Sequence, residues 1–465
     1  MATRTERDTL GTMEVPADAY YGAQTARALV NFPISGLLPA PDLVWATLII
    51  KQCAARANMA TGRLPAAVGE AIVQAAAEAL AGKLDGQFVV DPFQAGAGTS
   101  HNMNVNEVLA NRAAELLGGG PGRHDLVHPN DQVNMAQSTN DVFPTAMRLA
   151  CIRQVQRLHG TLARLHEALA AKGEEFDTIL KSGRTHLQDA VPIRLGQEFS
   201  AYARAVLLNS AAIDRCLPGL CELGIGGTAV GTGLNAEPAY IDTVVAEIAS
   251  ATGFPVTRGP DLVERMQNMA PFVELSSALK GLAVNLGRIA NDLRLLASGP
   301  RTGFDEIVLP AVQPGSSIMP GKVNPSMAEM LNMVCFQVLG ADTVVTMAAQ
   351  AGQLELNVMM PVIAHNLQFS LTILNNGVQS FTDRCVSDIR ANAARCNHYL
   401  ESSLGLVTAI APHVGYHAAA EVAQEAQRSG RTLVEVIRER ALLDDEQLAR
   451  ILAPEPLTRP GVPGK

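Results

Sequence analysis

The chain contains the segment Gly315-Ser316-Ser317-Ile318-Met319-Pro320-Gly321-Lys322-Val323-Asn324-Pro325. It combines two adjacent hydroxyls, one ammonium and one amide with two glycines, which allow the backbone angles of a hinge or a close approach. Lys322 can supply a point charge to a carboxylate, and Asn324 can add directional hydrogen bonds. The composition also fits an ordinary surface turn rich in Gly, Pro and Ser. We interpret the segment instead as a loop that moves and then closes on an anion.

The segment closely resembles the signature G-S-S-x-M-P-x-K-x-N of the aspartase/fumarase superfamily and matches it at every fixed position. Three further blocks resemble other shared blocks of that family, in the same order along the chain. They are Asp91–Ala113 (DPFQAGAGTSHNMNVNEVLANRA), Val127–Met147 (VHPNDQVNMAQSTNDVFPTAM) and Ser182–Phe199 (SGRTHLQDAVPIRLGQEF). The resemblance runs from about Thr9 to Gly464. It implies a mainly α-helical, three-domain fold with a long central helical bundle.

Composition and charge are consistent with that fold. A chain of 465 residues is long enough for several domains, and its 4% of aromatic residues suits long packed helices. The net charge of −9 argues against nucleic acid as a partner. Seven cysteines without CxxC spacing are typical of reduced thiols in a cytoplasmic protein. No secretory signal and no uninterrupted apolar run of membrane-spanning length is visible, so we expect a cytoplasmic protein without a membrane partner.

Three segments repeat apolar residues at the three- and four-residue spacing of one helix face. They lie at 155–169, 275–296 and 363–385. Faces of this kind pack helix against helix, and four or more such helices form a bundle. The resemblance implies a homotetramer whose four copies share this helical core. It also implies active sites that combine residues from several subunits.

Breaks in the pattern predict three domains. Residues 1–140 would form a mostly helical N-terminal domain, residues 141–394 a central domain of long helices, and residues 395–465 a small helical C-terminal domain. The last domain ends in a run rich in Pro and Gly. The motif blocks are far apart in the chain, so folding or assembly must gather them.

Two short blocks offer polar groups that could bind a carboxylate. Thr99 lies in Gly96–Ser100, a glycine-rich loop with open backbone N–H groups. The second block, Gln137–Asp141, presents Ser138, Thr139 and Asn140. Each block also fits a helix N-cap, because Ser, Thr, Asn and Asp are the usual capping residues. The resemblance to the family blocks favours binding.

His186 is the best candidate among the histidines, since it follows Arg184 and Thr185 in a polar run. The resemblance pairs this histidine with a glutamate four residues after Pro325, which is Glu329 here. A carboxylate partner would orient the imidazole and favour its charged form. We therefore place His186 and Glu329 together in the predicted catalytic machinery.

Other patterns carry little chemistry. The pairs His124/His128 and His413/His417 have helical spacing, but neither has the glutamate of an HExxH site. The run Gly224–Gly233 lacks the Lys-Ser/Thr of a phosphate-binding loop, so we interpret it as a tight turn near the active site. We expect neither a metal nor a cofactor.

These groups fit β-elimination from a small dicarboxylate with a succinate skeleton. A base removes a proton next to one carboxylate, and the resulting doubly charged aci-carboxylate must be held by preorganised donors. By motif position, the resemblance assigns the base to Ser316, which would need activation as an alkoxide by loop amides, a helix end and exclusion of water. The expected substrate-binding residues are Thr99, Ser138, Thr139, Asn140, Thr185, Ser317, Lys322 and Asn324.

The leaving group is ammonia or water. The segments Gly98–Ser100, Gln137–Asn140 and Gln353–Met359 resemble the family members that eliminate ammonia, whereas Tyr21–Thr25 and Gly226–Val230 fit the water-eliminating members equally well. We predict an aspartate ammonia-lyase activity that converts L-aspartate to fumarate. A class II fumarate hydratase activity is the alternative.

Two further alternatives are weaker. Relatives that became structural lens proteins would be expected to have lost motif residues, and here all of them are present. Cleavage of argininosuccinate or adenylosuccinate would require extra groups for a large leaving group, and the short, hydroxyl-rich loops offer none.

Overall fold

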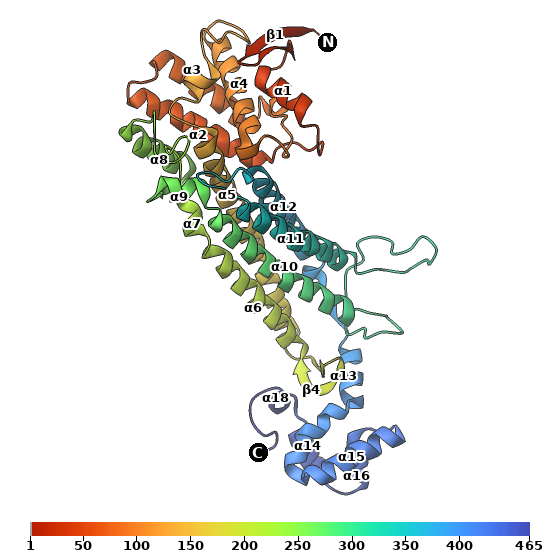
Figure 1. Cartoon of the computed structure of the whole chain (residues 1–465). Helices are drawn as coiled ribbons and strands as arrows, with labels where there is room; N and C mark the ends of the chain where they lie inside the picture. The colour runs from red at the N-terminus through yellow and green to blue at the C-terminus, as the bar shows by residue number, and fades with distance from the viewer. Residues whose placement is uncertain (1) are drawn as a thin grey trace. The chain divides into compact units, whose positions relative to one another are not determined.

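The structure is a computed structural model that describes residues 2–465 (Figure 1). Helices account for 62% of the chain, which confirms the mainly α-helical fold class. The chain divides into two compact units of interleaved segments. The first unit comprises residues up to His159, Ala211–Ala283 and Phe336–Asn375, and the second comprises Gly160–Ser210, Val284–Cys335 and Asn376–Lys465. The three-domain division drawn from the sequence stays a prediction.

Five long helices contribute residues to both units. They are α5 (Thr139–Glu175), α6 (Leu195–Asp214), α10 (Ala270–Leu296), α11 (Ser326–Gln350) and α12 (Met360–Arg384). The three apolar stripes predicted from the sequence lie on α5, α10 and α12, and every residue of each stripe is buried. Helical spacing therefore identified the packed faces correctly, because residues three and four apart share one side of a helix.

The first unit holds the shorter elements of residues 3–133 and 217–267. They are β1 (Thr3–Asp8), β2 (Gly11–Pro16), α1 (Ala23–Asn31), α2 (Pro41–Ala60), α3 (Ala66–Leu80), η1 (Asp85–Gln87), η2 (Gly96–Gly98), α4 (Thr99–Leu116), η3 (Pro129–Val133), α7 (Leu217–Cys221), β5 (Glu222–Leu223), α8 (Pro238–Thr252), β6 (Thr257–Arg258) and α9 (Leu262–Gln267). The strands β1 and β2 pair antiparallel, and β5 and β6 pair parallel. Helices α2, α3 and α4 share a core that includes Leu48, Ile72 and Val108.

The second unit holds the shorter elements of residues 180–194 and 307–457. They are β3 (Leu180–Thr185), β4 (Gln188–Arg194), β7 (Ile307–Val308), η4 (Val386–Asp388), β8 (Arg390–Ala391), α13 (Ala393–Ser402), η5 (Leu404–Leu406), α14 (Val407–Val414), α15 (Tyr416–Ser429), α16 (Leu433–Glu439), α17 (Asp445–Ile451) and α18 (Pro454–Leu457). The residue types explain where two of these helices begin. Thr432 and Glu435 form a capping box at the start of α16, and Asp444 and Gln447 form one at the start of α17. The two strand pairs of this unit are antiparallel.

Helix α11 is unusually apolar. Among the described residues it is the one helix that is long and apolar enough to cross a membrane by length and composition, although only 39% of its apolar window is buried. Its charged residues Glu329 and Asp342 interrupt the run, which is why the sequence shows no continuous apolar stretch. A helix that packs on several sides has the same composition, and Asp342 is buried and bonded to Ser276 at 2.8 Å.

Candidate active site

A hollow of about 740 Å³ lies in the first unit, between the starts of α4 and α5 and two loops. Its polar lining includes Thr99, Asn102, Asn134, Gln137, Ser138 and Thr139. The fold thus brings Thr99 together with Ser138 and Thr139, which are about forty residues away in the chain. A concave site with a few convergent polar groups is the usual form of a small-molecule pocket.

The start of α4 is shaped by Gly98. Its φ of +84° is a left-handed conformation, and a Cβ atom there would lie 2.2 Å from the Phe143 ring. Only glycine meets both conditions. The next residue, Thr99, is therefore the first of α4, where the free N–H groups and the positive helix end favour an anion. Its hydroxyl lies 3.3 Å from the Gly96 carbonyl oxygen.

The start of α5 is a capped helix end as well as a pocket wall. The Ser138 Oγ atom accepts a hydrogen bond from the Asn140 N–H at 3.2 Å, and the Asp141 carboxylate accepts one from the Ser138 N–H at 2.9 Å. These are the capping contacts that the residue types also predicted. Capping uses the hydroxyl oxygen as an acceptor, so its proton stays available as a donor to a ligand.

The glycine-rich turn after β5 packs against this helix start. The N–H groups of Gly226 and Thr228 each donate to the Asp141 carboxylate at 3.0 Å. The Asn140 amide nitrogen donates to the Ala229 carbonyl at 2.8 Å. That contact fixes the amide of Asn140 and leaves its oxygen as an acceptor. Burial raises the pKa of Asp141 to about 7, and its three backbone hydrogen bonds and the charge of Lys51 oppose the rise.

Lys51 was missed in the sequence analysis. It is fully buried on α2, and its ammonium donates to Asn134 Oδ1 at 2.8 Å and to Gln137 Oε1 at 2.9 Å. Both partners line the hollow. Burial lowers the pKa of Lys51 to about 7, against a favourable interaction with Asp141. The available signal was a lysine that directly follows the apolar run Leu48–Ile50 in the helix Pro41–Ala60, where an unpaired charge is costly.

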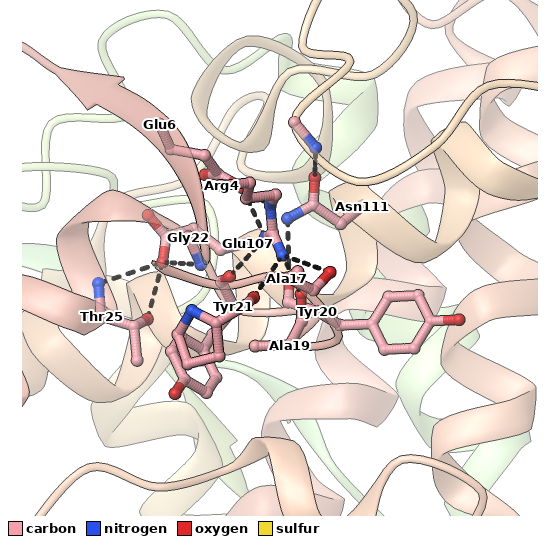
Figure 2. A network of polar contacts seen from close by, with 12 residues as sticks. Arg4, Glu6, Ala17, Ala19, Tyr20, Tyr21, Gly22, Thr25, Glu107 and Asn111 are labelled. Atoms are coloured by element: carbon pink, nitrogen blue, oxygen red, sulfur yellow. Dashed lines mark hydrogen bonds and ion pairs between the residues drawn. The ribbon is translucent and has the colours of Figure 1, made fainter. Parts of the chain in front are cut away.

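The N-terminal segment reaches the same hollow through Gln24. Figure 2 shows Gly22 and Thr25 of this segment beside Glu107. Glu107 on α4 accepts hydrogen bonds from the N–H groups of Gly22, Gln24 and Thr25 at 2.9, 2.8 and 3.1 Å, and from the Thr25 hydroxyl at 2.6 Å. Burial raises the pKa of Glu107, while these four donors stabilise its charged form. The segment is thereby fastened to the helix that begins at Thr99.

The signature loop belongs to the second unit and is closed at its base. The Gly315 N–H donates to the Lys322 carbonyl at 2.8 Å, and the Asn324 amide nitrogen donates to the Gly315 carbonyl at 2.6 Å. A Cβ atom on Gly315 would lie 2.4 Å from the Lys322 carbonyl oxygen, so glycine is required there. The exposed Lys322 has no ion-pair partner within residues 2–465. The second N–H of Asn324 remains for another acceptor.

Ser316 lies inside this loop, and backbone N–H groups hold its hydroxyl in place. Its Oγ atom accepts hydrogen bonds from the N–H groups of Ile318 at 3.2 Å and Met319 at 3.0 Å. Two backbone donors aimed at one oxygen stabilise negative charge on it. The neighbouring Ser317 is exposed.

The hairpin β3–β4 carries Thr185 and His186. Its two-residue turn consists of His186 and Leu187, whose φ angles of +56° and +59° are left-handed and costly for residues other than glycine. Both side chains are exposed. Arg184, just before them, is bound to the buried Glu306 at 2.9 Å. Arg184 is thus committed to holding the hairpin.

Glu329 lies in the first turn of α11 and is half-buried. No hydrogen bond or ion pair joins it to His186 within the part of the chain that the structure describes. The predicted pairing of these two residues stays a prediction. The structure groups the remaining candidates by element: Thr185 with His186 on the hairpin, and four residues on one loop. Those four are Ser316, Ser317, Lys322 and Asn324.

Comparison with models of known protein families matches two parts of this chain. Residues 11–340 match the family described as Lyase, and residues 406–459 match the Fumarase C C-terminus. The chain belongs to the aspartase/fumarase family of lyases. The four motif blocks that line the hollow or form the loop and hairpin all fall within the first match.

Relatives of two kinds match this lyase equally well. Aspartate ammonia-lyase of Bacillus subtilis is 50% identical over 462 residues, which cover 99% of this chain and 97% of the relative. Class II fumarate hydratase of Methylorubrum extorquens is 50% identical over 459 residues, which cover 98% and 97%. Identity alone therefore shows the family and does not separate the two leaving groups.

A solved relative has the same fold. The structure of fumarate lyase:delta crystallin from Brucella melitensis bound to cobalt superposes with a TM-score of 0.94 at 48% sequence identity. The match covers 98% of this chain and 99% of that one. The predicted aspartase/fumarase-like fold with long central helices is confirmed.

Proposed function

We propose that this lyase catalyses the reversible β-elimination of ammonia from L-aspartate to give fumarate. The observation that carries the proposal is the pair of backbone N–H groups, from Ile318 and Met319, that point at Ser316 Oγ. Serine is a poor base at its ordinary pKa, and the two donors lower the cost of the alkoxide, as exclusion of water by a closed loop would do further. Ser316 would then be the general base.

In the proposed reaction, Ser316 takes a proton from the carbon next to the side-chain carboxylate of aspartate. The electron pair of that C–H bond moves into the carboxylate, which becomes a doubly charged aci-carboxylate. The pair then forms the C=C bond as the C–N bond breaks and ammonia leaves. Preorganised donors are the main source of catalysis for such charge. The hydroxyls of Thr99, Ser138, Thr139 and Ser317 are the proposed donors.

The second carboxylate of the substrate needs a fixed counter-charge. The ammonium of Lys322, which has no ion-pair partner within residues 2–465, and the second N–H of Asn324 can supply it from the signature loop. Thr185 would add a hydroxyl, and His186 with Glu329 would form the remaining catalytic pair. Asn324 would also keep the loop closed at its base, so its substitution should affect the loop as well as binding.

We propose further that four copies assemble into a homotetramer with composite active sites. Helix α11 carries Met333, Phe336 and Met347 along one face, and these side chains are 67%, 64% and 66% exposed in the single chain. Fully burying side chains of this size contributes about 1.5–3 kcal/mol each. The exposed turn of His186 and Leu187 would likewise meet a neighbouring chain, which would give His186 its partner.

Ammonia is favoured over water by the amide of Asn140. One N–H of that amide is already bound to the Ala229 carbonyl, which leaves the second N–H as a donor and the oxygen as an acceptor for a ligand. An ammonium group has only donors and needs such an acceptor. The fumarate hydratase alternative draws its support from the equally similar hydratase relative.

One absorbance assay tests both activities, because fumarate absorbs ultraviolet light strongly and aspartate and malate do not. We expect rapid fumarate formation from L-aspartate and at least about a hundredfold slower formation from L-malate, since mismatched donors would be left unpaired. Rapid reaction of malate with none of aspartate would replace ammonia with water in the proposal. It would leave the fold, the proposed base and the proposed clamp unchanged.

A further inference from the structure

Three donors converge on one oxygen atom beneath the hollow. Asn134 Oδ1 accepts hydrogen bonds from the Lys51 ammonium at 2.8 Å and from the amide nitrogens of Asn102 and Asn106 at 3.2 Å each. Lys51, Asn102 and Asn106 are all buried to 1% exposure or less. A carbonyl oxygen has two lone pairs, so three donors leave it no freedom to turn toward a ligand. The Asn134 amide is a fixed part of the pocket floor.

This cluster determines the direction of the Thr139 hydroxyl. The Asn102 amide nitrogen uses one N–H for Asn134 Oδ1 and the other for Thr139 Oγ1, at 3.1 Å. Because Thr139 accepts from Asn102, its own O–H must point elsewhere, and Thr139 lines the hollow. The ammonium of Lys51 also holds Gln137, two residues before Thr139, through Gln137 Oε1 at 2.9 Å.

We propose that Lys51 is a positioning residue of the active site, which acts through Asn134 and Asn102 to present the Thr139 hydroxyl as a hydrogen-bond donor to a substrate carboxylate. The inference rests on the proposed function in one respect, namely that an anionic dicarboxylate occupies the hollow. It does not depend on whether ammonia or water leaves.

A purely structural role for Lys51 is a weaker account of the same contacts. A buried lysine without a bonded carboxylate costs folding free energy, and an apolar side chain of similar length would fill the space more cheaply. Lys51 does not act as a proton relay either, since amides separate it from the hollow. The Lys51 ammonium binds the side chains of Asn134 and Gln137. These two residues lie in the loop that leads into Thr139.

The test is a set of four double-mutant cycles. Lys51→Met and Asn102→Asp are each combined with Thr139→Val and, separately, with Thr99→Val, which lies on the same hollow outside the cluster. Asn102→Asp preserves shape but offers Thr139 an acceptor, so the hydroxyl should turn away from the hollow. Two quantities are measured: kcat/KM for whichever of aspartate or malate is converted, and the Kd of succinate.

We expect each single variant, Lys51→Met and Asn102→Asp, to lose about 10- to 100-fold in kcat/KM. In the Thr139→Val background the further loss should be under about threefold, whereas with Thr99→Val the losses should multiply. The control Lys172→Met removes a buried lysine bonded to Glu175, away from the hollow, and should leave kcat/KM unchanged.

If the loss in kcat/KM from Lys51→Met multiplies with that of Thr139→Val just as it does with that of Thr99→Val, the proposal is overturned and Lys51 is a structural residue. Should Lys51→Met fail to fold, the Asn102→Asp cycles test the link between Asn102 and Thr139 through which Lys51 is proposed to act, and a lack of coupling there overturns the proposal. The succinate measurement separates the two hypotheses. If succinate binds but the double-mutant cycles show no coupling to Thr139, the role of Lys51 is rejected and the dicarboxylate site stands. If succinate does not bind, the dicarboxylate site is rejected together with this inference.

Discussion

The Oγ atom of Ser316 lies 3.0 Å from the backbone nitrogen of Met319 and accepts its hydrogen bond. The loop that contains both residues is closed at its base by Gly315 and Lys322, so the donor and the acceptor are held together by the loop itself. A hydroxyl in this setting forms an alkoxide more readily than one in water. The chemistry proposed for Ser316 therefore depends on loop geometry more than on the residue type.

Ser316→Ala should abolish turnover and leave binding of succinate nearly intact, because a base acts in the transition state and adds little to ground-state affinity. The expected loss is at least about 10³-fold in kcat, or roughly 4 kcal/mol of barrier. Steady-state kinetics and titration calorimetry with succinate provide the two numbers. Ser429→Ala, on α15, is the matched control. Turnover within about tenfold of the parent would remove Ser316 from this role.

Lys322→Met should weaken aspartate and succinate binding alike, since the ammonium contacts a carboxylate in both ground and transition states. A charge-assisted hydrogen bond contributes roughly 1.5–3 kcal/mol, so affinity should fall about 10- to 100-fold. The exposed Lys83→Met serves as the control. Arg184 is unsuitable as a substitute because it is bound to Glu306. Unchanged succinate affinity would mean that another cation holds the carboxylate.

Mixed refolding tests the composite sites. Ser316→Ala and His186→Ala should each be inactive, and refolding them together should restore activity in about a quarter of the sites, because random mixing in a closed oligomer gives some sites both intact residues. Light scattering should report four chains. A fully active monomer, or mixtures as inactive as the single variants, would contradict the proposed assembly.

His101→Gln tests a buried histidine beside the site. Burial, followed by the charge of Lys51, lowers the pKa of His101 to about 4, so between pH 6.5 and 4 only the unfolded chain binds the proton. The free energy of unfolding should then fall by about 3 kcal/mol as the pH drops through this window. Glutamine can keep a bond to Thr47, the partner of His101 at 2.9 Å, and it removes the titration.

Urea unfolding at pH 7 and pH 5, at one protein concentration, measures the effect as a difference between parent and variant. Asp141, whose pKa is raised to about 7, gains a proton on folding between pH 3.8 and 7 and acts in the opposite direction. This contribution is common to both proteins and cancels. Identical pH slopes for parent and His101→Gln would show that His101 is charged in the folded state.

Local sequence patterns were sufficient for much of this protein. The spacing of Leu275 to Leu296 identified the buried face of α10 because helix geometry alone relates residues three and four apart. The residue types of Ser138 and Asp141 implied a capped helix start, since capping is a contact within a few residues. The signature around Ser316 identified the family, and with it the fold.

Tertiary structure alone decided which residues support the site. Lys51 and Asn134 are 83 residues apart, and no spacing rule relates α2 to the loop before α5. Their contact exists because α2 and α4 pack together and the loop before α5 lies across them. The same holds for Arg184, whose role became clear only when folding placed Glu306 beside it. Contacts within a few residues, such as helix caps and helix faces, can be predicted from neighbouring residue types. The partner of a buried charge is determined by the packing of the whole chain.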